Sequence, residues 1–175
     1  MLAGGGLPAA ERIAIYLDFD GTPSPASVEL MKSEAARLVE PAGFPVEWRL
    51  LGTRGQNPVR GLVVVRLTGS CSAEGISQPM GSGRLTLGST AVVEGHVLPY
   101  CRIECDAVRQ FLAGWPCGRI SKETQYGQAL GHVLAHELYH ALLRTTHHHS
   151  AGFTKAIQRP QDLRPDDLWQ SESEH

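Results

Sequence analysis

Short apolar runs and one amphipathic stretch alternate along the first part of the chain. Residues 12–19, 44–51 and 61–67 are rich in β-branched and aromatic side chains and end near Gly, Pro or Asp, so each run predicts a β-strand. Between the first two runs, the apolar side chains of residues 25–39 recur every three or four positions, which is typical of an amphipathic helix, and Pro41 marks its end. The predicted order is therefore strand, helix, strand, strand.

Two further strands are expected in the middle of the chain. Residues 85–94 and 96–105 carry β-branched and other apolar side chains, with Gly95 between them and Pro99 weakening the second run. The preceding residues 69–83 are rich in Ser, Gly and Pro, which predicts a surface loop that could line a cleft.

Two more helices follow these strands. Asp106 is a suitable N-cap for a helix over residues 106–115, and Ser121 for a long helix that ends near Arg144. Strands and helices in this order predict an α+β fold, and the length of the chain suggests one domain, over residues 11–157.

The long helix contains the pattern His-Glu-x-x-His at His136, Glu137 and His140. Side chains four positions apart share a face of a helix, so the two histidines can bind one metal ion while Glu137 points elsewhere. The apolar residues around the pattern form a stripe that buries this helix: Tyr126, Leu130, Val133, Leu134, Leu138, Ala141 and Leu142. Two histidines and a glutamate are costly to bury without a partner, which favours a metal site.

With this helix the chain resembles the zincin metallopeptidases, whose active-site helix carries His136, Glu137 and His140 in the same form. The resemblance implies a small mixed β-sheet packed on helices, with an antiparallel edge strand above the metal, for which residues 85–94 are the candidate. It also implies Zn²⁺ as the cofactor, a zinc-bound water activated by Glu137, and hydrolysis of a peptide or protein substrate that pairs with the edge strand.

Catalytic zinc sites usually have three protein ligands, so a third must be found. If the helix continued, His147 would lie about 10 Å beyond His140, too far for a Zn–N bond of ~2 Å. The helix must therefore end, and residues 145–152 offer the break, because β-branched and hydroxyl residues are followed by Gly152. One of the consecutive histidines 147–149 can then return to the metal.

The choice among these histidines comes from resemblance. The chain is similar to small bacterial zincin-like proteins in which the third histidine lies four residues before a glycine, which selects His148, with His147 and His149 as alternatives. The metzincin form does not fit, because Leu143 and Thr146 stand at its glycine and ligand positions. The gluzincin form needs a downstream Glu on a second helix, and only Glu residues of the polar C-terminal segment remain.

Other residues near the motif have weaker assignments. His132 lies one turn before His136, and we interpret it as a cleft residue or a residue that supports the ligands. An oxyanion-stabilising partner is expected, and Tyr100, Tyr139 and Lys155 are candidates that the sequence does not separate.

Two alternative functions compete with the peptidase. Asp18 and Asp20 follow a predicted strand and resemble the first motif of haloacid dehalogenase-type phosphatases, in which Asp18 is the nucleophile and Asp20 the acid or base beside Mg²⁺. The third class is a zincin-like protein that binds zinc without catalysis. Retention of Glu137 argues against that class, because metal binding alone does not need it.

The charge and hydropathy of the chain restrict the classes of partner that it can be expected to bind. The formal net charge is −2 and no basic run occurs, so no nucleic-acid partner is expected. The sequence contains no run of eighteen apolar residues, so we expect no membrane-spanning helix. We expect a monomer that acts on a peptide or protein.

The terminal segments and the cysteines give indications of the cellular compartment of the protein. Residues 1–10 are small and apolar and resemble the end of a signal peptide, which favours a secreted or periplasmic protein, and residues 158–175 predict a polar tail. The four cysteines allow three full disulfide pairings and fit an oxidising compartment. The pattern Cys-x-x-Cys does not occur, so we expect no cysteine-based zinc site.

Overall fold

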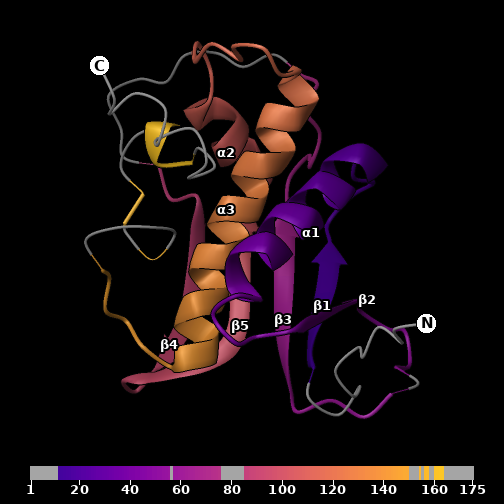
Figure 1. The fold of residues 1–175 in the computed structure, drawn as a ribbon, viewed down its shortest axis with the longest axis vertical. Helices are drawn as coiled ribbons and strands as arrows, with labels where there is room; N and C mark the ends of the chain where they lie inside the picture. Colours follow the sequence, from indigo (N-terminus) through magenta and orange to yellow (C-terminus); the bar gives the residue numbers. More distant parts are fainter. Residues whose placement is uncertain are drawn as a thin grey trace, which may run out of the picture.

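The computed structural model describes residues 12–55, 57–75, 85–149, 154, 156–157 and 160–163 (Figure 1). The predicted N-terminal segment 1–10 and most of the predicted tail lie outside these ranges. The elements in chain order are β1 (Ile13–Phe19), α1 (Pro25–Val39), β2 (Val46–Leu50), β3 (Gly61–Thr68), β4 (Gly88–Val93), β5 (His96–Glu104), α2 (Cys105–Phe111), α3 (Lys122–Leu143) and η3 (Pro160–Leu163). The predicted α+β class is confirmed, and each predicted strand and helix has a counterpart.

The strands form one mixed five-stranded sheet in the order β2-β1-β3-β5-β4. β1 runs parallel to β2 and β3, and β3 runs parallel to β5. β4 pairs with β5 in the antiparallel direction and lies at the edge of the sheet. The antiparallel edge strand expected within residues 85–94 is therefore present, and its ladder begins at Gly88.

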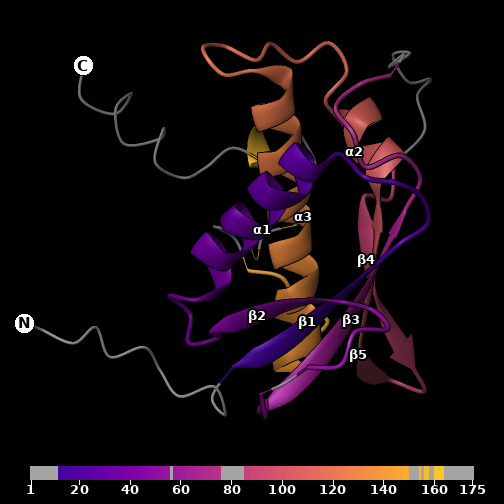
Figure 2. The same cartoon turned by 90° about the vertical axis from the view of Figure 1, so that its right-hand side faces the viewer.

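Helices α1 and α3 cover the same face of the sheet (Figure 2). They approach closely where α3 has glycines one turn apart, Gly127 and Gly131. A Cβ atom at Gly131 would lie 2.6 Å from the Glu34 Cβ and 2.7 Å from the Met31 carbonyl oxygen. A Cβ atom at Gly127 would lie 2.4 Å from the Leu30 Cβ. The two glycines therefore allow α1 to pack directly on the backbone of α3.

Helix α3 is the centre of the molecule, and all its residues from 129 to 141 are buried. The sheet and α1 each cover part of its surface, and η3 also contacts it. Leu163 in η3 is buried within the core cluster, so the packed domain continues into the stretch predicted to be a polar tail. Among the described helices, none has the length and apolar character needed to cross a membrane.

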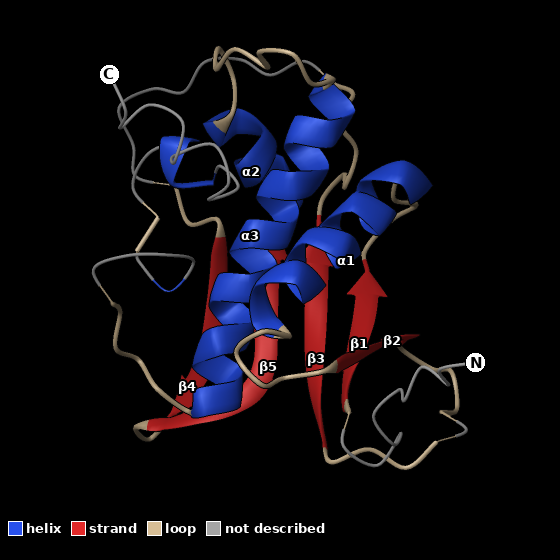
Figure 3. Ribbon diagram, in the orientation of Figure 1, coloured by secondary structure: helices blue, strands red, loops and turns tan. Residues whose placement is uncertain are grey.

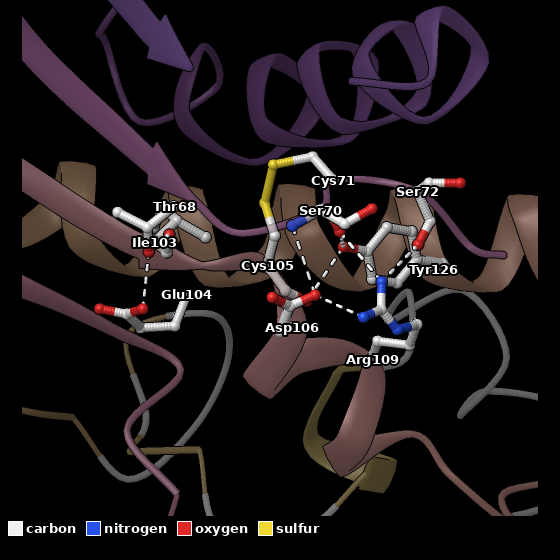
Figure 4. Close-up of a disulfide and its surroundings, with 10 residues drawn as sticks. All are labelled: Thr68, Ser70, Cys71, Ser72, Ile103, Glu104, Cys105, Asp106, Arg109 and Tyr126. Atoms are coloured by element: carbon white, nitrogen blue, oxygen red, sulfur yellow. Dashed lines mark hydrogen bonds and ion pairs between the residues drawn. A yellow bond between two sulfur atoms is a disulfide. The ribbon is translucent and has the colours of Figure 1, made fainter. Parts of the chain in front are cut away.

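A disulfide between Cys71 and Cys105 joins the segment after β3 to the first residue of α2 (Figure 4). Beside it, the Arg109 guanidinium donates hydrogen bonds of 3.1 Å to the carbonyl oxygens of Ser70 and Ser72. The Tyr126 hydroxyl of α3 donates to the Cys105 carbonyl oxygen over 3.0 Å. These contacts attach the start of α2 to β3 and α3. The remaining cysteines, Cys101 and Cys117, are free.

The helix predicted over residues 106–115 is shorter in the structure. It begins at Cys105 and ends at Phe111, because residues 112–114 form a turn in which Gly114 adopts a positive φ of 79°. The predicted cap, Asp106, instead lies in the first turn and forms an ion pair with Arg109.

Loss of the disulfide should lower the stability of the protein. The bridge closes a loop with a sequence separation of 34 that contains β4 and β5. Constraining such a loop in the unfolded chain stabilises a protein by roughly 2–4 kcal/mol. We expect the double substitution Cys71→Ala/Cys105→Ala to lower the free energy of unfolding in urea by this amount, with Cys117→Ser as the control. Equal stability of the double variant and the wild type would contradict a structural role for the bridge.

Candidate metal centre

Three histidine side chains meet at the C-terminal end of α3. His136 and His140 come from neighbouring turns of the helix, and His148 comes from the irregular segment that follows it, shown in Figure 3. The three Nε2 atoms form a nearly equilateral triangle, with separations of 3.2 Å between His136 and His140, 3.3 Å between His140 and His148, and 3.2 Å between His136 and His148.

This triangle fits a tetrahedral metal ion. Two imidazole nitrogens bound at about 2.05 Å to a tetrahedral ion lie about 3.3 Å apart, which matches all three observed separations. Hydrogen bonds among the three Nε2 atoms explain this arrangement less well than a metal ion does. Each neutral Nε2 carries either a proton or a lone pair, so among three nitrogens at least two are alike and one contact is repulsive. A cation that accepts three lone pairs satisfies all three nitrogens at once.

The chain after α3 also orients the ring of His140. Arg144 caps the helix in the left-handed conformation, with φ 50° and ψ 45°, and the Thr145 amide donates to the His140 carbonyl oxygen over 3.1 Å. The Thr145 carbonyl oxygen then lies 2.7 Å from Nδ1 of His140. A carbonyl can only accept, so Nδ1 carries the proton and the Nε2 lone pair is directed at the other histidines. Burial lowers the pKa of His140, which favours the neutral form that binds metal.

The three consecutive histidines 147–149 have different positions relative to the cluster. His148 joins the cluster, whereas His147 is exposed and its amide donates to the Thr145 hydroxyl over 3.1 Å. His149 lies with its ring centroid 5.8 Å from that of Tyr139, and its amide donates to the Thr154 carbonyl oxygen. The alternatives His147 and His149 are therefore not part of the cluster. Gly152, on which the choice of His148 depended, lies outside the described residues.

Glu137 is only 6% exposed and lies beside the histidine cluster without belonging to it. The Thr90 hydroxyl on β4 donates a hydrogen bond of 2.7 Å to its Oε2 atom. Burial raises the pKa of the Glu137 carboxyl to about 7, although the hydrogen bond from Thr90 opposes the shift. A carboxyl group with a pKa in this range can both accept and return a proton near neutral pH.

The histidines and Glu137 line a cavity of about 380 Å³ between the edge strand and α3. One wall is β4 with the residues before it, and further parts come from the segment after α3, including Ile157. Its described lining residues are Leu85, Thr86, Leu87, Gly88, Ser89, Thr90, Val92, Val97, Val133, His136, Glu137, His140, Thr145, Thr146, His148, Ala156 and Ile157. The lining therefore combines the histidines and Glu137 with both hydroxyl-bearing and apolar side chains.

Several residues singled out from the sequence lie elsewhere. His132 is buried and does not line the cavity, so of its two predicted roles the cleft residue is excluded and support of the neighbouring histidines stays a prediction. Tyr139 and Tyr100 are also absent from the cavity wall; Tyr100 is 41% exposed on β5. Lys155 lies outside the described residues. No oxyanion-stabilising side chain is therefore assigned.

Asp18 and Asp20 lie at the end of β1, and both form ion pairs with Arg66 of β3. Neither carboxylate lines the cavity beside the histidines. The guanidinium of Arg66 therefore occupies one oxygen of each carboxylate that the phosphatase alternative needs for Mg²⁺ and for nucleophilic attack.

No pattern in the sequence indicates that Thr90 is a partner of Glu137. The two residues are 47 positions apart and meet only because β4 packs beside α3.

Comparisons of the chain with protein-family models, with curated proteins and with solved structures found no significant match.

The substitution Glu137→Gln should stabilise the metal-free protein at pH 8 but have little effect at pH 5. The pKa of Glu137 rises from 4.5 to about 7 on folding, so wild-type stability is lost as the pH rises through this interval. A difference of about 2.5 units corresponds to about 3 kcal/mol, which sets an upper limit on the gain. Urea unfolding with a chelator at both pH values measures it.

The exposed Glu29 of α1 provides the control for this experiment, because its side chain is 72% exposed. Glu29→Gln should change the stability little at either pH. An equal effect of Glu137→Gln at pH 5 and pH 8 would show that the buried carboxylate does not govern this pH dependence.

Proposed function

We propose that the protein is a zinc-dependent metallopeptidase with a zincin-like catalytic domain. The observation that carries the proposal is the convergence of His136, His140 and His148 on one point, with the carboxylate of Glu137 beside them in the same cavity. Three imidazole ligands with one open position are the donor set of a catalytic zinc site. The exposure of His148 leaves this side of the site accessible to solvent.

Each residue then has a chemical role. A bound Zn²⁺ would polarise the scissile carbonyl group and lower the pKa of a water molecule. His136, His140 and His148, whose Nε2 atoms face one another, would hold the ion. Because Thr90 occupies Oε2 of Glu137, we assign Oε1 as the atom that accepts the proton of the attacking water and passes it to the leaving nitrogen. A cation near Glu137 favours its ionised form, in which it can accept this proton.

The edge strand supports a peptide as the substrate. Among the described residues β4 is the last strand of the sheet and pairs with β5, and the cavity lies along it. An extended peptide can add to such an edge by main-chain hydrogen bonds, which would place its backbone beside Glu137 and the histidines. The same antiparallel strand beside the motif helix supports the zincin-like assignment.

The alternatives have less support. A protein that only binds zinc does not need Glu137, whose burial raises its pKa and disfavours its charge. The haloacid dehalogenase-type phosphatase needs Asp18 and Asp20 free to act, and both are paired with Arg66. We therefore prefer the peptidase.

Metal analysis of purified variants tests the proposed site. We expect one zinc ion per chain in the wild type and strongly reduced zinc in His136→Ala and His148→Ala, because each loses one of three ligands. His147→Ala and His149→Ala are matched controls from the same segment and should retain zinc. Loss of zinc in a control together with retention in His148→Ala would contradict the assignment of the third ligand. A folded wild type that takes up no added zinc would contradict the metal site.

A peptide-library cleavage screen then tests catalysis. The zinc-loaded wild type should cleave peptides, and Glu137→Ala should retain zinc but lose at least about 100-fold in kcat, the range associated with a general base. Cleavage that is unchanged in Glu137→Ala would contradict the proposed role of this residue.

A further inference from the structure

We propose that strand β4 positions the Glu137 carboxylate, with Thr90 and Gly88 as its positioning residues. This inference rests on the proposed function, because it assigns the residues that direct the proposed general base. Both residues lie on the wall of the cavity, and being two positions apart in a strand, they face the same side.

Thr90 makes a specific contact with Glu137. Its Oγ1 atom lies 2.7 Å from Oε2 and 3.0 Å from the backbone oxygen of Glu137. A hydroxyl has one proton, and the shorter distance and negative charge direct it to Oε2. The Cys101 thiol also donates to the Glu137 backbone oxygen, over 3.5 Å, so that oxygen has another partner. The hydroxyl of Thr90 therefore fixes one end of the carboxylate.

Gly88 provides the space that the carboxylate occupies. A Cβ atom at this position would lie 2.9 Å from Cγ and 3.0 Å from Oε1 of Glu137, and 3.0 Å from Cγ1 of Val133. These separations are shorter than normal contacts between carbon and neighbouring atoms. A side chain at residue 88 would therefore displace Glu137 or Val133. Glycine at this position lets the strand backbone lie directly against the side chain of Glu137.

The strand has a local irregularity at this point. Its register against β5 shifts between Thr90, which pairs with Cys101, and Val92, which pairs with Val97. Such irregularities redirect side chains and are common at the edges of sheets. The strand that holds Glu137 is therefore also the edge available to a substrate, so substrate pairing and the orientation of Glu137 depend on the same backbone.

The substitution Thr90→Val tests the role of the hydroxyl, since it removes the donor with little change in shape. In the zinc-loaded protein we expect kcat to fall about 10- to 100-fold, as for other groups that orient a catalytic side chain. KM and zinc affinity should stay unchanged, because neither substrate binding nor the histidines lose a contact. Thr90→Ser keeps the hydroxyl and should restore most of the activity. A wild-type kcat in Thr90→Val would overturn the proposal.

Two further variants separate positioning from general stability. Thr68→Val removes a similar buried hydroxyl, which donates to Glu104 Oε2 over 2.6 Å, outside the cavity (Figure 4). It should leave kcat and KM unchanged, and an equal fall in kcat for Thr68→Val and Thr90→Val would overturn the proposal. Gly88→Ala should lower kcat with zinc retained, because its methyl group displaces Glu137.

A double-mutant cycle on the metal-free protein tests the contact without activity. Thr90→Val should shift the urea midpoint of the wild type but shift that of Glu137→Ala much less, because the partner is already absent. Equal shifts in both backgrounds would overturn the proposed contact. If the cycle shows coupling but the zinc-loaded wild type cleaves no peptide, the peptidase proposal fails while the positioning of Glu137 by Thr90 is supported.

Discussion

The site depends on the requirement that three imidazole nitrogens meet at one point without a repulsive contact. Two of them are brought together by helical spacing, since His136 and His140 lie one turn apart on α3. The third requires the helix to stop and the chain to return. Arg144 makes this reversal in the left-handed conformation, and the Thr145 carbonyl that follows sets the tautomer of His140. One local change of backbone direction thus completes the cluster of three histidines and orients the ring of His140.

The rest of the fold keeps α3 in place around this site. Glycines on α3 let α1 approach closely, and the sheet covers another side, so the motif histidines and Glu137 are buried. Burial disfavours charge on Glu137 and raises its pKa to about 7. In the metal-free protein this carboxylate therefore opposes folding at alkaline pH. The edge strand offsets part of this cost through the hydroxyl of Thr90.

Local patterns allowed the strands, the helices and the pair His136 and His140 to be predicted, because hydrophobic periodicity reports which face of an element is buried. The contacts that complete the site are not local. Nothing near Thr90 in the sequence indicates that it meets Glu137, since their contact depends on how β4 packs beside α3. The selection of His148 over its neighbours needed a family resemblance, because three consecutive histidines in an irregular segment have no periodicity to separate them. The pairing of the cysteines likewise depended on the arrangement of the sheet.

The most direct test of the account is zinc K-edge X-ray absorption spectroscopy on the zinc-loaded protein. The geometry of the three Nε2 atoms predicts a four-coordinate ion with three imidazole nitrogens and one oxygen at about 2.0–2.1 Å, without sulfur. In His148→Ala the imidazole contribution should fall from three to two. A spectrum of the wild type with two imidazoles, with sulfur near about 2.3 Å, or unchanged by His148→Ala would contradict a centre built from these three histidines.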